Sequence, residues 1–159
     1  MAYDLHPPGL YQLGLVHTIY QYCEEFSEKN EIDIDFFAAG MDDLKISPDT
    51  EINLYRLIQE GLWNIKKHAE ATKVTVKLVA SFPNIILRIK DDGKGFNVKE
   101  RLSAASKEKR MGLRSMEERV SLLNGKMKIQ SRPTERTKIF IEVPYKEKNR
   151  VRKEDHIDH

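Results

Sequence analysis

Apolar and polar residues follow two different periods along this chain, and the periods predict where helices and strands lie. Segments with apolar residues three or four positions apart are typical of helices packed on one side, and strict alternation is typical of half-buried strands. The predicted helices cover residues 10–26, 48–68 and 112–125, and the predicted strands cover residues 31–38, 72–80, 85–91, 126–131 and 137–144.

The order of these elements predicts the fold class. Adjacent strands follow one another as hairpins and do not alternate strictly with helices, so a Rossmann-type winding is disfavoured. We expect a two-layer α/β sandwich, in which a mixed sheet carries helices on one face. Residues 97–110 are polar and lysine-rich, with few side chains to bury, so we expect an irregular and mobile loop there. The charged segment 146–159 is expected to be disordered.

Composition narrows the class of protein. A length of 159 residues fits one domain, and a single cysteine, Cys23, rules out an internal disulfide. No apolar run is long enough to span a bilayer, and the N-terminus has no signal-peptide pattern. We therefore expect a cytoplasmic domain without direct membrane contact, although its parent protein can still be membrane-anchored. The net charge is −8 over residues 1–50 and +7 over residues 98–159, so the second half suits an anionic ligand.

The helix predicted at residues 48–68 carries a polar stripe beside its apolar face. Glu60, Asn64, Lys67 and His68 fall within about 100° of arc at helical spacing. Most stripes of this kind are solvated flanks held by pairs four residues apart. The stripe alone therefore leaves a structural and a functional interpretation open.

Two glycine-containing segments are also candidates for ligand binding. In DDGKGF, Asp91 ends a strand, and Gly93 and Gly95 permit positive φ and close approach of a ligand to the backbone. In RMGLRSMEERV, Gly112 is expected at the N-terminus of a helix, where free N–H groups favour an anion. A tight turn and an ordinary helix start explain the same residues, so each signal by itself is weak.

The ordered combination of these segments is far more specific than any one of them. The motif E-x-x-x-N-x-x-K-H is followed by D-x-G-x-G, a polar segment, G-L-x-x-M-x-x-R and a strand opened by threonine. This series resembles the catalytic ATP-binding domain of histidine kinases, in the superfamily shared with DNA gyrase. It is most similar to the nitrate/nitrite- and degradation-type sensor kinases. The stretch LHPPGLYQLGL resembles the joint between the phosphoacceptor bundle and this domain. The resemblance implies a Bergerat-type ATP-binding fold.

The resemblance assigns roles to the residues of the polar stripe. Asn64 matches the Mg²⁺ ligand of the family, and an amide oxygen suits a hard cation. Glu60 matches the residue thought to act as general base toward the attacking histidine. Lys67 is placed to reach phosphate oxygens, and His68 matches the family's histidine beside it.

The remaining matches surround the adenine. Asp91 matches the carboxylate that accepts a hydrogen bond from the adenine amino group, and Thr137 matches the threonine of the adenine-side network. Other positions near the nucleotide are Gly93, Gly95, Gly112 and Leu113. The implied ligands are ATP and Mg²⁺.

Three departures from the family pattern qualify the resemblance. Arg110 and Arg136 stand where the family often has glycine, and no histidine is followed by Asp or Glu as a phosphoacceptor would be. We therefore expect a catalytic domain at residues 10–145, preceded by a joint at 1–9 and followed by the tail at 146–159. Its partner would be a histidine-bearing bundle absent from this chain, with a response regulator acting indirectly and the isolated domain monomeric.

Two other functions keep the same fold. A degenerate nucleotide-binding or scaffolding module fits the two arginines, and a serine kinase of the anti-sigma type shares the motifs. The joint-like LHPPGLYQLGL disfavours the serine kinase, which has no bundle to join. Nucleic-acid binding is not expected, because the aromatic residues do not interleave with basic runs.

Overall fold

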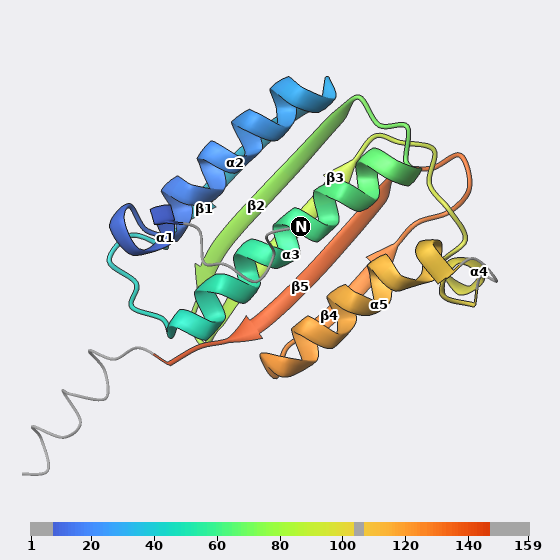
Figure 1. Ribbon diagram of the computed structural model, residues 1–159. Coiled ribbons are helices and arrows are strands. Elements are labelled where there is room, and N and C mark those ends of the chain that lie inside the picture. The colour runs from blue at the N-terminus through green and yellow to red at the C-terminus, as the bar shows by residue number, and fades with distance from the viewer. Residues whose placement is uncertain (1–7, 104–106, 147–159) are drawn as a thin grey trace, which may run out of the picture.

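The computed structural model describes residues 8–103 and 107–146, with the side chains of Pro8, Tyr11 and residues 107–110 left out. It has two layers, a sheet and a layer of helices that covers one face of it (Figure 1). The helices are α1 (Pro8–Gln12), α2 (Leu15–Asn30), α3 (Pro48–His68), α4 (Val98–Leu102) and α5 (Lys107–Leu122), and the strands are β1 (Asp33–Ala39), β2 (Lys73–Ser81), β3 (Asn84–Asp91), β4 (Lys126–Gln130) and β5 (Thr137–Pro144). The predicted two-layer α/β fold is confirmed.

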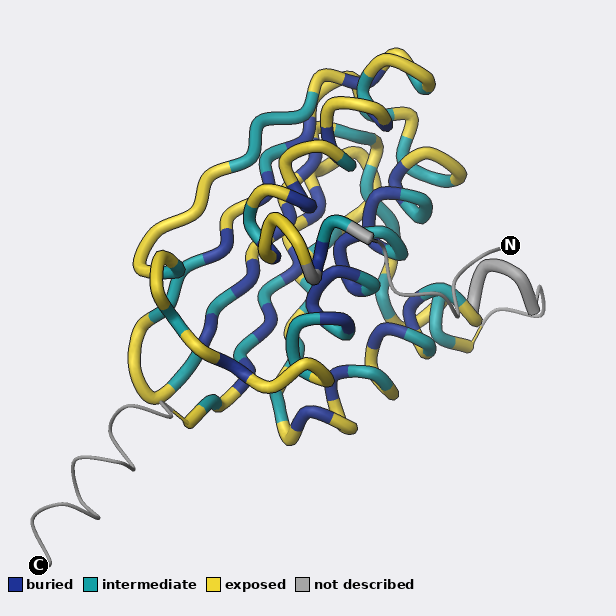
Figure 2. The backbone as a smooth tube through the Cα atoms, turned by 60° about the vertical axis from the view of Figure 1, so that its left-hand side comes forward, coloured by how far each residue is buried: buried dark blue, intermediate teal, exposed yellow. Residues whose placement is uncertain are grey.

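The five strands form one mixed sheet in the order β1-β2-β3-β5-β4. β1 runs parallel to β2, and every other neighbouring pair is antiparallel. Along β2, β3 and β5 buried and outward residues alternate, as Figure 2 shows by the change of colour along the strands. The alternation predicted from the sequence therefore has the correct register.

The core lies between the sheet and α3, the central helix of the layer. Leu54, Ile58 and Leu62 of α3 are fully buried, as are Leu87 of β3 and Ile141 of β5. α3 begins where the sequence predicts: Ser47 caps it, with its side chain accepting from the Thr50 N–H, and Pro48 follows at the first helical position. This firm placement of α3 fixes the polar stripe on its neighbouring face.

The first predicted helix differs from the structure. α1 and α2 are separate because Gly14 has a φ of 82°, a left-handed conformation that interrupts a right-handed helix. α2 also continues past Phe26 to Asn30. The predicted joint at 1–9 and tail at 146–159 lie almost entirely outside the described residues.

The prediction of an irregular loop at residues 97–110 is wrong for much of this segment. α4 begins after Asn97, whose side chain accepts from the Glu100 N–H, and α5 begins at Lys107. Residues 107–111 (KEKRM) are good helix formers, and a single glycine costs a helix only about 1 kcal/mol relative to alanine. Gly112 therefore lies inside α5, and the anion site expected at a helix N-terminus there is not present. Residues 104–106 lie outside the described part of the chain.

Candidate functional site

Glu60, the first residue of the predicted polar motif, lies on α3 and faces α5. Its Oε1 accepts hydrogen bonds from Arg119 Nη2 at 3.0 Å and from Ser115 Oγ at 3.1 Å. The Glu60 and Arg119 side chains are 17% and 19% exposed, so the ion pair is largely shielded from water. The structure gives the buried Oε2 of Glu60 no hydrogen-bond partner. One oxygen of this carboxylate is thus held, and the other is left to accept.

Asn64, one turn further along α3, packs directly under Gly112 of α5. Its Nδ2 donates to Met116 Sδ at 3.7 Å. A Cβ at position 112 would collide with the Asn64 amide, so only glycine permits this contact without a shift. Gly112 is therefore required by the packing of α5 on α3, a reason that the sequence did not reveal.

Asp91 ends β3 on the core side of the sheet and is only 3% exposed. Burial raises the pKa of its carboxyl, the nearby Asp92 adds to the rise, and the hydrogen bond from the Gly93 N–H (2.8 Å) opposes it. Thr137 lies opposite Asp91 in the pairing of β3 with β5 and is also buried. A buried carboxylate beside a hydroxyl can accept from a ligand's amine.

Ser131 joins this pair to the loop after β3, and sequence reasoning missed it. Its Oγ lies 2.7 Å from Thr137 Oγ and accepts from the Phe96 N–H at 2.9 Å. Serine at the end of a short strand carries no special sequence signal, so only the fold shows this connection.

The glycines of DDGKGF serve the turn between β3 and α4. Gly95 has a φ of 67°, and a Cβ there would strike the backbone carbonyls of Arg132 and Glu135. The backbone of Gly93 is not in the positive-φ region, contrary to the sequence-based expectation. A Cβ added at this position would instead strike the carbonyl of Ala69. Both positions need glycine because neighbouring backbone lies against them.

A small cavity of about 30 Å³ opens among these elements. Five of the predicted residues line it, namely Asn64, His68, Asp91, Leu113 and Thr137. Glu60, Lys67, Gly93, Gly95 and Gly112 do not line it. Ligand pockets usually measure about 300–1,000 Å³, so the cavity must widen to take a nucleotide.

Phe96 and Arg101 line the cavity as well, and neither was predicted. The Arg101 guanidinium lies over the Phe96 ring, 4.3 Å from its centre, and burial lowers the pKa of Arg101. Phe96 follows the D-x-G-x-G motif directly, so its position was a usable signal. Arg101 lies in α4, within the segment expected to be a loop, and could not be placed from sequence.

The residues present fit a divalent cation that takes its other ligands from a substrate and water. The Asn64 amide lines the cavity and supplies one oxygen donor of the kind that such a cation takes from the protein. Among the described residues no group of three or more His, Cys, Asp or Glu side chains is placed to hold a metal. Mg²⁺ in proteins commonly binds one or two protein oxygen atoms and completes its coordination with phosphate oxygens and water.

Arg136, one of the two unexpected arginines, lies in the loop between β4 and β5 and is exposed. It lines a surface groove with Lys90 and Lys138, away from the small cavity. The side chain of Arg110 is outside the described part. No helix of the described ranges has the length and apolar character needed to cross a membrane.

Comparison with known proteins adds sequence relatives and structural neighbours. Residues 49–147 match the family described as histidine kinase-, DNA gyrase B- and HSP90-like ATPase. The chain is 42% identical over 140 residues to the signal transduction histidine-protein kinase/phosphatase DegS of Bacillus subtilis, covering 87% of this chain and 36% of DegS. It is 36% identical over 154 residues to the sensor protein VraS of Staphylococcus aureus, covering 97% of this chain and 40% of VraS.

Solved structures share the fold at lower identity. Full-length ShkA in complex with AMPPNP superposes with a TM-score of 0.67 and 17% identity, covering 84% of this chain and 30% of ShkA. The nucleotide-free catalytic domain of the histidine kinase ThkA has a TM-score of 0.59 and 19% identity, covering 82% of this chain and 89% of that domain. Since the chain spans less than half the length of the DegS and VraS relatives, it corresponds to one part of such proteins.

Proposed function

Because this chain belongs to the histidine kinase-, DNA gyrase B- and HSP90-like ATPase family, we propose that it is the ATP-binding catalytic domain of a sensor histidine kinase. We also propose that this domain lies in the cytoplasm. It transfers the γ-phosphoryl group of ATP to a histidine on a bundle that this chain lacks. The observation that carries the proposal is the buried carboxylate of Asp91, which faces the same small cavity as Asn64. The similarity to DegS and VraS supports the choice of kinase class.

The proposed domain comprises residues 10–145, with residues 1–9 as the joint to the phosphoacceptor bundle. A response regulator receives the phosphoryl group from that bundle and has no direct role in the transfer described here. The isolated domain is monomeric under this proposal.

Asp91 selects adenine. Its carboxylate accepts a hydrogen bond from the exocyclic amine, which guanine does not present at that position. Thr137, coupled through Ser131 to the backbone of Phe96, holds the adenine side of the cavity. Since burial raises the Asp91 pKa, a bound amine donor also compensates a carboxylate that has lost much of its hydration.

Asn64 and Lys67 act on the triphosphate side. The Asn64 amide oxygen would hold Mg²⁺, which neutralises part of the phosphate charge when bound. Lys67 is exposed on the same helix and provides a positive charge for phosphate oxygens.

Glu60 acts as general base toward the attacking histidine. Arg119 and Ser115 hold its Oε1, so Oε2 takes the proton from the imidazole as the new N–P bond forms and the bond to the ADP oxygen breaks. General-base contributions are typically about 10²–10⁴-fold.

Nucleotide entry requires movement of α5 relative to α3. The cavity of about 30 Å³ is too small for ATP, and Leu113 of α5 and Arg101 of α4 form part of its lining. The contact of Gly112 with Asn64 must loosen for the Asn64 oxygen to reach a cation.

Calorimetry with ATP and ADP tests the site. We expect Asn64→Ala to weaken Mg²⁺-dependent ATP binding more than metal-free ADP binding, and Asp91→Asn to weaken both. Equal losses for the two variants with and without Mg²⁺ would contradict these roles. Lys45→Ala serves as the control, because Lys45 is exposed and does not line the cavity.

Transfer is tested with a cognate bundle supplied in trans. The chain alone should form no acid-labile phosphohistidine, and Glu60→Ala should reduce transfer by about 10²-fold or more while changing ATP binding little. An effect below about threefold would exclude Glu60 as the base. ATP binding without transfer to any bundle would favour the degenerate module.

A further inference from the structure

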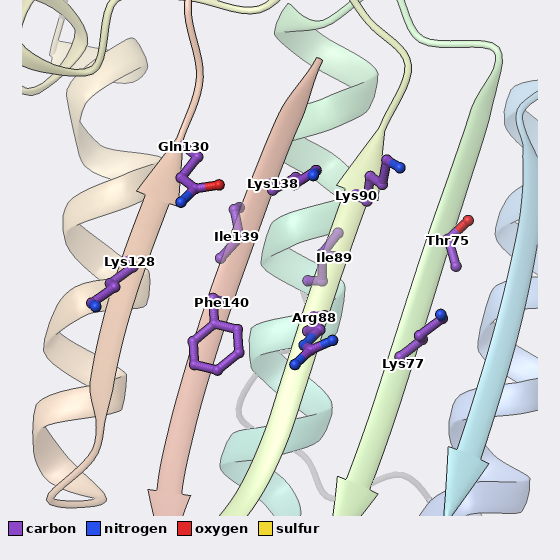
Figure 3. Close-up of a pocket in the computed structure, with 10 residues that line it drawn as sticks. All are labelled: Thr75, Lys77, Arg88, Ile89, Lys90, Lys128, Gln130, Lys138, Ile139 and Phe140. Atoms are coloured by element: carbon purple, nitrogen blue, oxygen red, sulfur yellow. The ribbon is translucent and has the colours of Figure 1, made fainter.

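The face of the sheet opposite the helices carries a basic groove of about 550 Å³ that the proposed kinase site does not use. We define the basic groove by the side chains in Figure 3 that give it charge and shape, namely Lys77, Arg88, Lys90, Lys128, Lys138 and Phe140. They come from β2, β3, β4 and β5 and stand on the outward side of the sheet. No aspartate or glutamate contributes to its lining, which lies wholly within the described residues.

Two pairs of like charges stand directly opposite each other across this groove. Lys77 of β2 is paired in register with Arg88 of β3, and Lys90 of β3 with Lys138 of β5. Like charges at directly opposite positions destabilise an antiparallel pair. Threonine or glutamine would fit these exposed positions without that repulsion. An anion bound between the paired cations would relieve it.

Acidic residues on this face stand at its margins. Asp35 of β1 lies 3.5 Å from Lys73 at one end of β2, outside the groove lining. Glu142 of β5 is opposite Lys126 of β4 and likewise does not line the groove. Glu135, in the loop between β4 and β5, lines a neighbouring groove with Lys90 and Lys138 but does not line the basic groove itself.

Aromatic rings support two of the cations. The Arg88 guanidinium lies 5.2 Å from the centre of the Phe140 ring, and Lys77 Nζ lies 6.0 Å from the centre of the Phe37 ring. Stacking of this kind holds a long side chain against the sheet with its charge outward. Phe37 nevertheless stays 55% exposed at the edge of the sheet, so a binding experiment with a nucleic acid is needed to separate the two kinds of ligand.

We propose that the basic groove binds an acidic polypeptide segment, held by Arg88, Lys90 and Lys138 through its carboxylates. Arg88 and Lys90 are two residues apart on β3, about 7 Å, which matches alternate side chains of an extended chain. Lys138 is directly opposite Lys90 in the sheet, with their Cβ atoms about 5 Å apart. Both ammonium groups can therefore contact one carboxylate. A hollow groove suits a chain segment better than the plane of a bilayer.

The groove also lies behind the nucleotide cavity. Lys90 directly precedes Asp91 on β3, and Lys138 directly follows Thr137 on β5, with their side chains on opposite faces of the sheet. A segment bound on the outer face would therefore contact the same two strand ends that hold the adenine side of the cavity. The proposal itself does not depend on kinase activity, so its test uses binding alone.

The test is fluorescence anisotropy of the 159-residue chain with a labelled peptide of alternating glutamate and serine. We expect saturable binding at low salt that weakens about tenfold or more near physiological ionic strength. A peptide of alternating glutamine and serine should not bind. The variant Lys90→Glu/Lys138→Glu should weaken binding of the acidic peptide about tenfold or more. The variant Lys29→Glu/Lys45→Glu, with the same change in charge at exposed positions off the sheet, should weaken it less than about twofold.

A second variant keeps the proposal testable if charge reversal prevents folding. Lys138→Gln removes one like-charge pair, so it should raise the melting temperature while it weakens binding of the acidic peptide. No binding by the unaltered chain, equal losses in the two double variants, or unchanged binding by Lys138→Gln would overturn the proposal. Tighter binding of an oligothymidylate, or of vesicles containing anionic phosphatidylglycerol, would likewise overturn it.

Discussion

Arg119 of α5 reaches Glu60 of α3, and its Nη2 donates to Glu60 Oε1 at 3.0 Å. Its Nη1 also donates to Asn53 Oδ1 at 2.9 Å, so one guanidinium links α5 to two turns of α3. Gly112 of the same helix packs against Asn64. The contact that orients the proposed base thus belongs to the same helix pair whose separation is needed to admit the nucleotide.

We expect Arg119→Ala to lower the free energy of unfolding by about 2 kcal/mol, because it leaves the largely buried Glu60 carboxylate without its charged donor. Urea unfolding measures this. Arg114→Ala is the matched control. Arg114 is exposed and donates to the Leu102 carbonyl at 3.3 Å, so its loss should cost less than about 0.5 kcal/mol. Similar losses of stability in both variants would show that the ion pair of Arg119 with Glu60 stabilises the fold no more than an exposed hydrogen bond does.

Asp91→Asn should stabilise the nucleotide-free protein while it weakens adenine binding. Burial raises the folded-state pKa of Asp91 above its usual value, so the ionised form is disfavoured in the folded protein. Asparagine keeps an oxygen for the Gly93 N–H and has no charge to bury. Thermal unfolding at pH 7 without nucleotide should show a higher midpoint for Asp91→Asn; a lower one would contradict the role of burial.

The pH dependence supplies a separate measurement of the same group. The stability associated with protonated Asp91 is fully present below the usual aspartate pKa and is lost as pH rises through the higher folded-state pKa. The difference in stability between Asp91→Asn and the unaltered chain should therefore grow over this acidic range and then become constant. A difference independent of pH would mean that Asp91 is ionised equally easily in both states.

The strands were predictable because their outward and inward residues alternate, and a half-buried sheet enforces that period. The start of α3 was predictable from Ser47 and Pro48, whose preference for helix starts is local. The break at Gly14 and the start of α5 at Lys107 were not, because glycine is compatible with several conformations and KEKRM forms a helix only where tertiary packing supports it.

The candidate site was predicted as a set of positions, and its internal contacts were not. Asn64, His68, Asp91, Leu113 and Thr137 do line one cavity. The bonds from Arg119 and Ser115 to Glu60 join residues that are 59 and 55 positions apart in the sequence. No local pattern specifies such pairs, because they depend on the angle at which α5 packs on α3.

Gly95→Ala should destabilise the fold far more than Gly14→Ala. Both glycines have positive φ, 67° and 82°, where the backbone strain of an alanine costs about 1–3 kcal/mol. A Cβ at position 14 meets nothing within 4 Å, whereas one at position 95 strikes two backbone carbonyls. We expect about 1 kcal/mol for Gly14→Ala and at least about 2 kcal/mol more for Gly95→Ala, measured by urea unfolding. Equal losses of stability in the two variants would mean that the turn after β3 shifts at little cost to make room for the Cβ.

Cys23 should be inert to thiol reagents in the folded protein. It is 3% exposed, and burial raises the pKa of its thiol from 9.0 to about 12. Because the thiolate is the reactive form, alkylation by iodoacetamide at pH 8.5 should occur only through unfolding and should accelerate strongly in urea.

The raised pKa of Cys23 also has a thermodynamic consequence. Above about pH 9 the unfolded chain loses the thiol proton while the folded chain keeps it, so stability falls as pH rises until about pH 12. The slope from this one group is at most about 1.4 kcal/mol per pH unit. Cys23→Ala should be less stable than the unaltered chain at pH 7, because it leaves a small space in the core, and that deficit should shrink above pH 9. Urea unfolding of both proteins between pH 7 and pH 10.5 measures the difference. A deficit that stays constant over this range, together with rapid alkylation of the folded protein, would show that the thiol ionises freely and is not enclosed by the core.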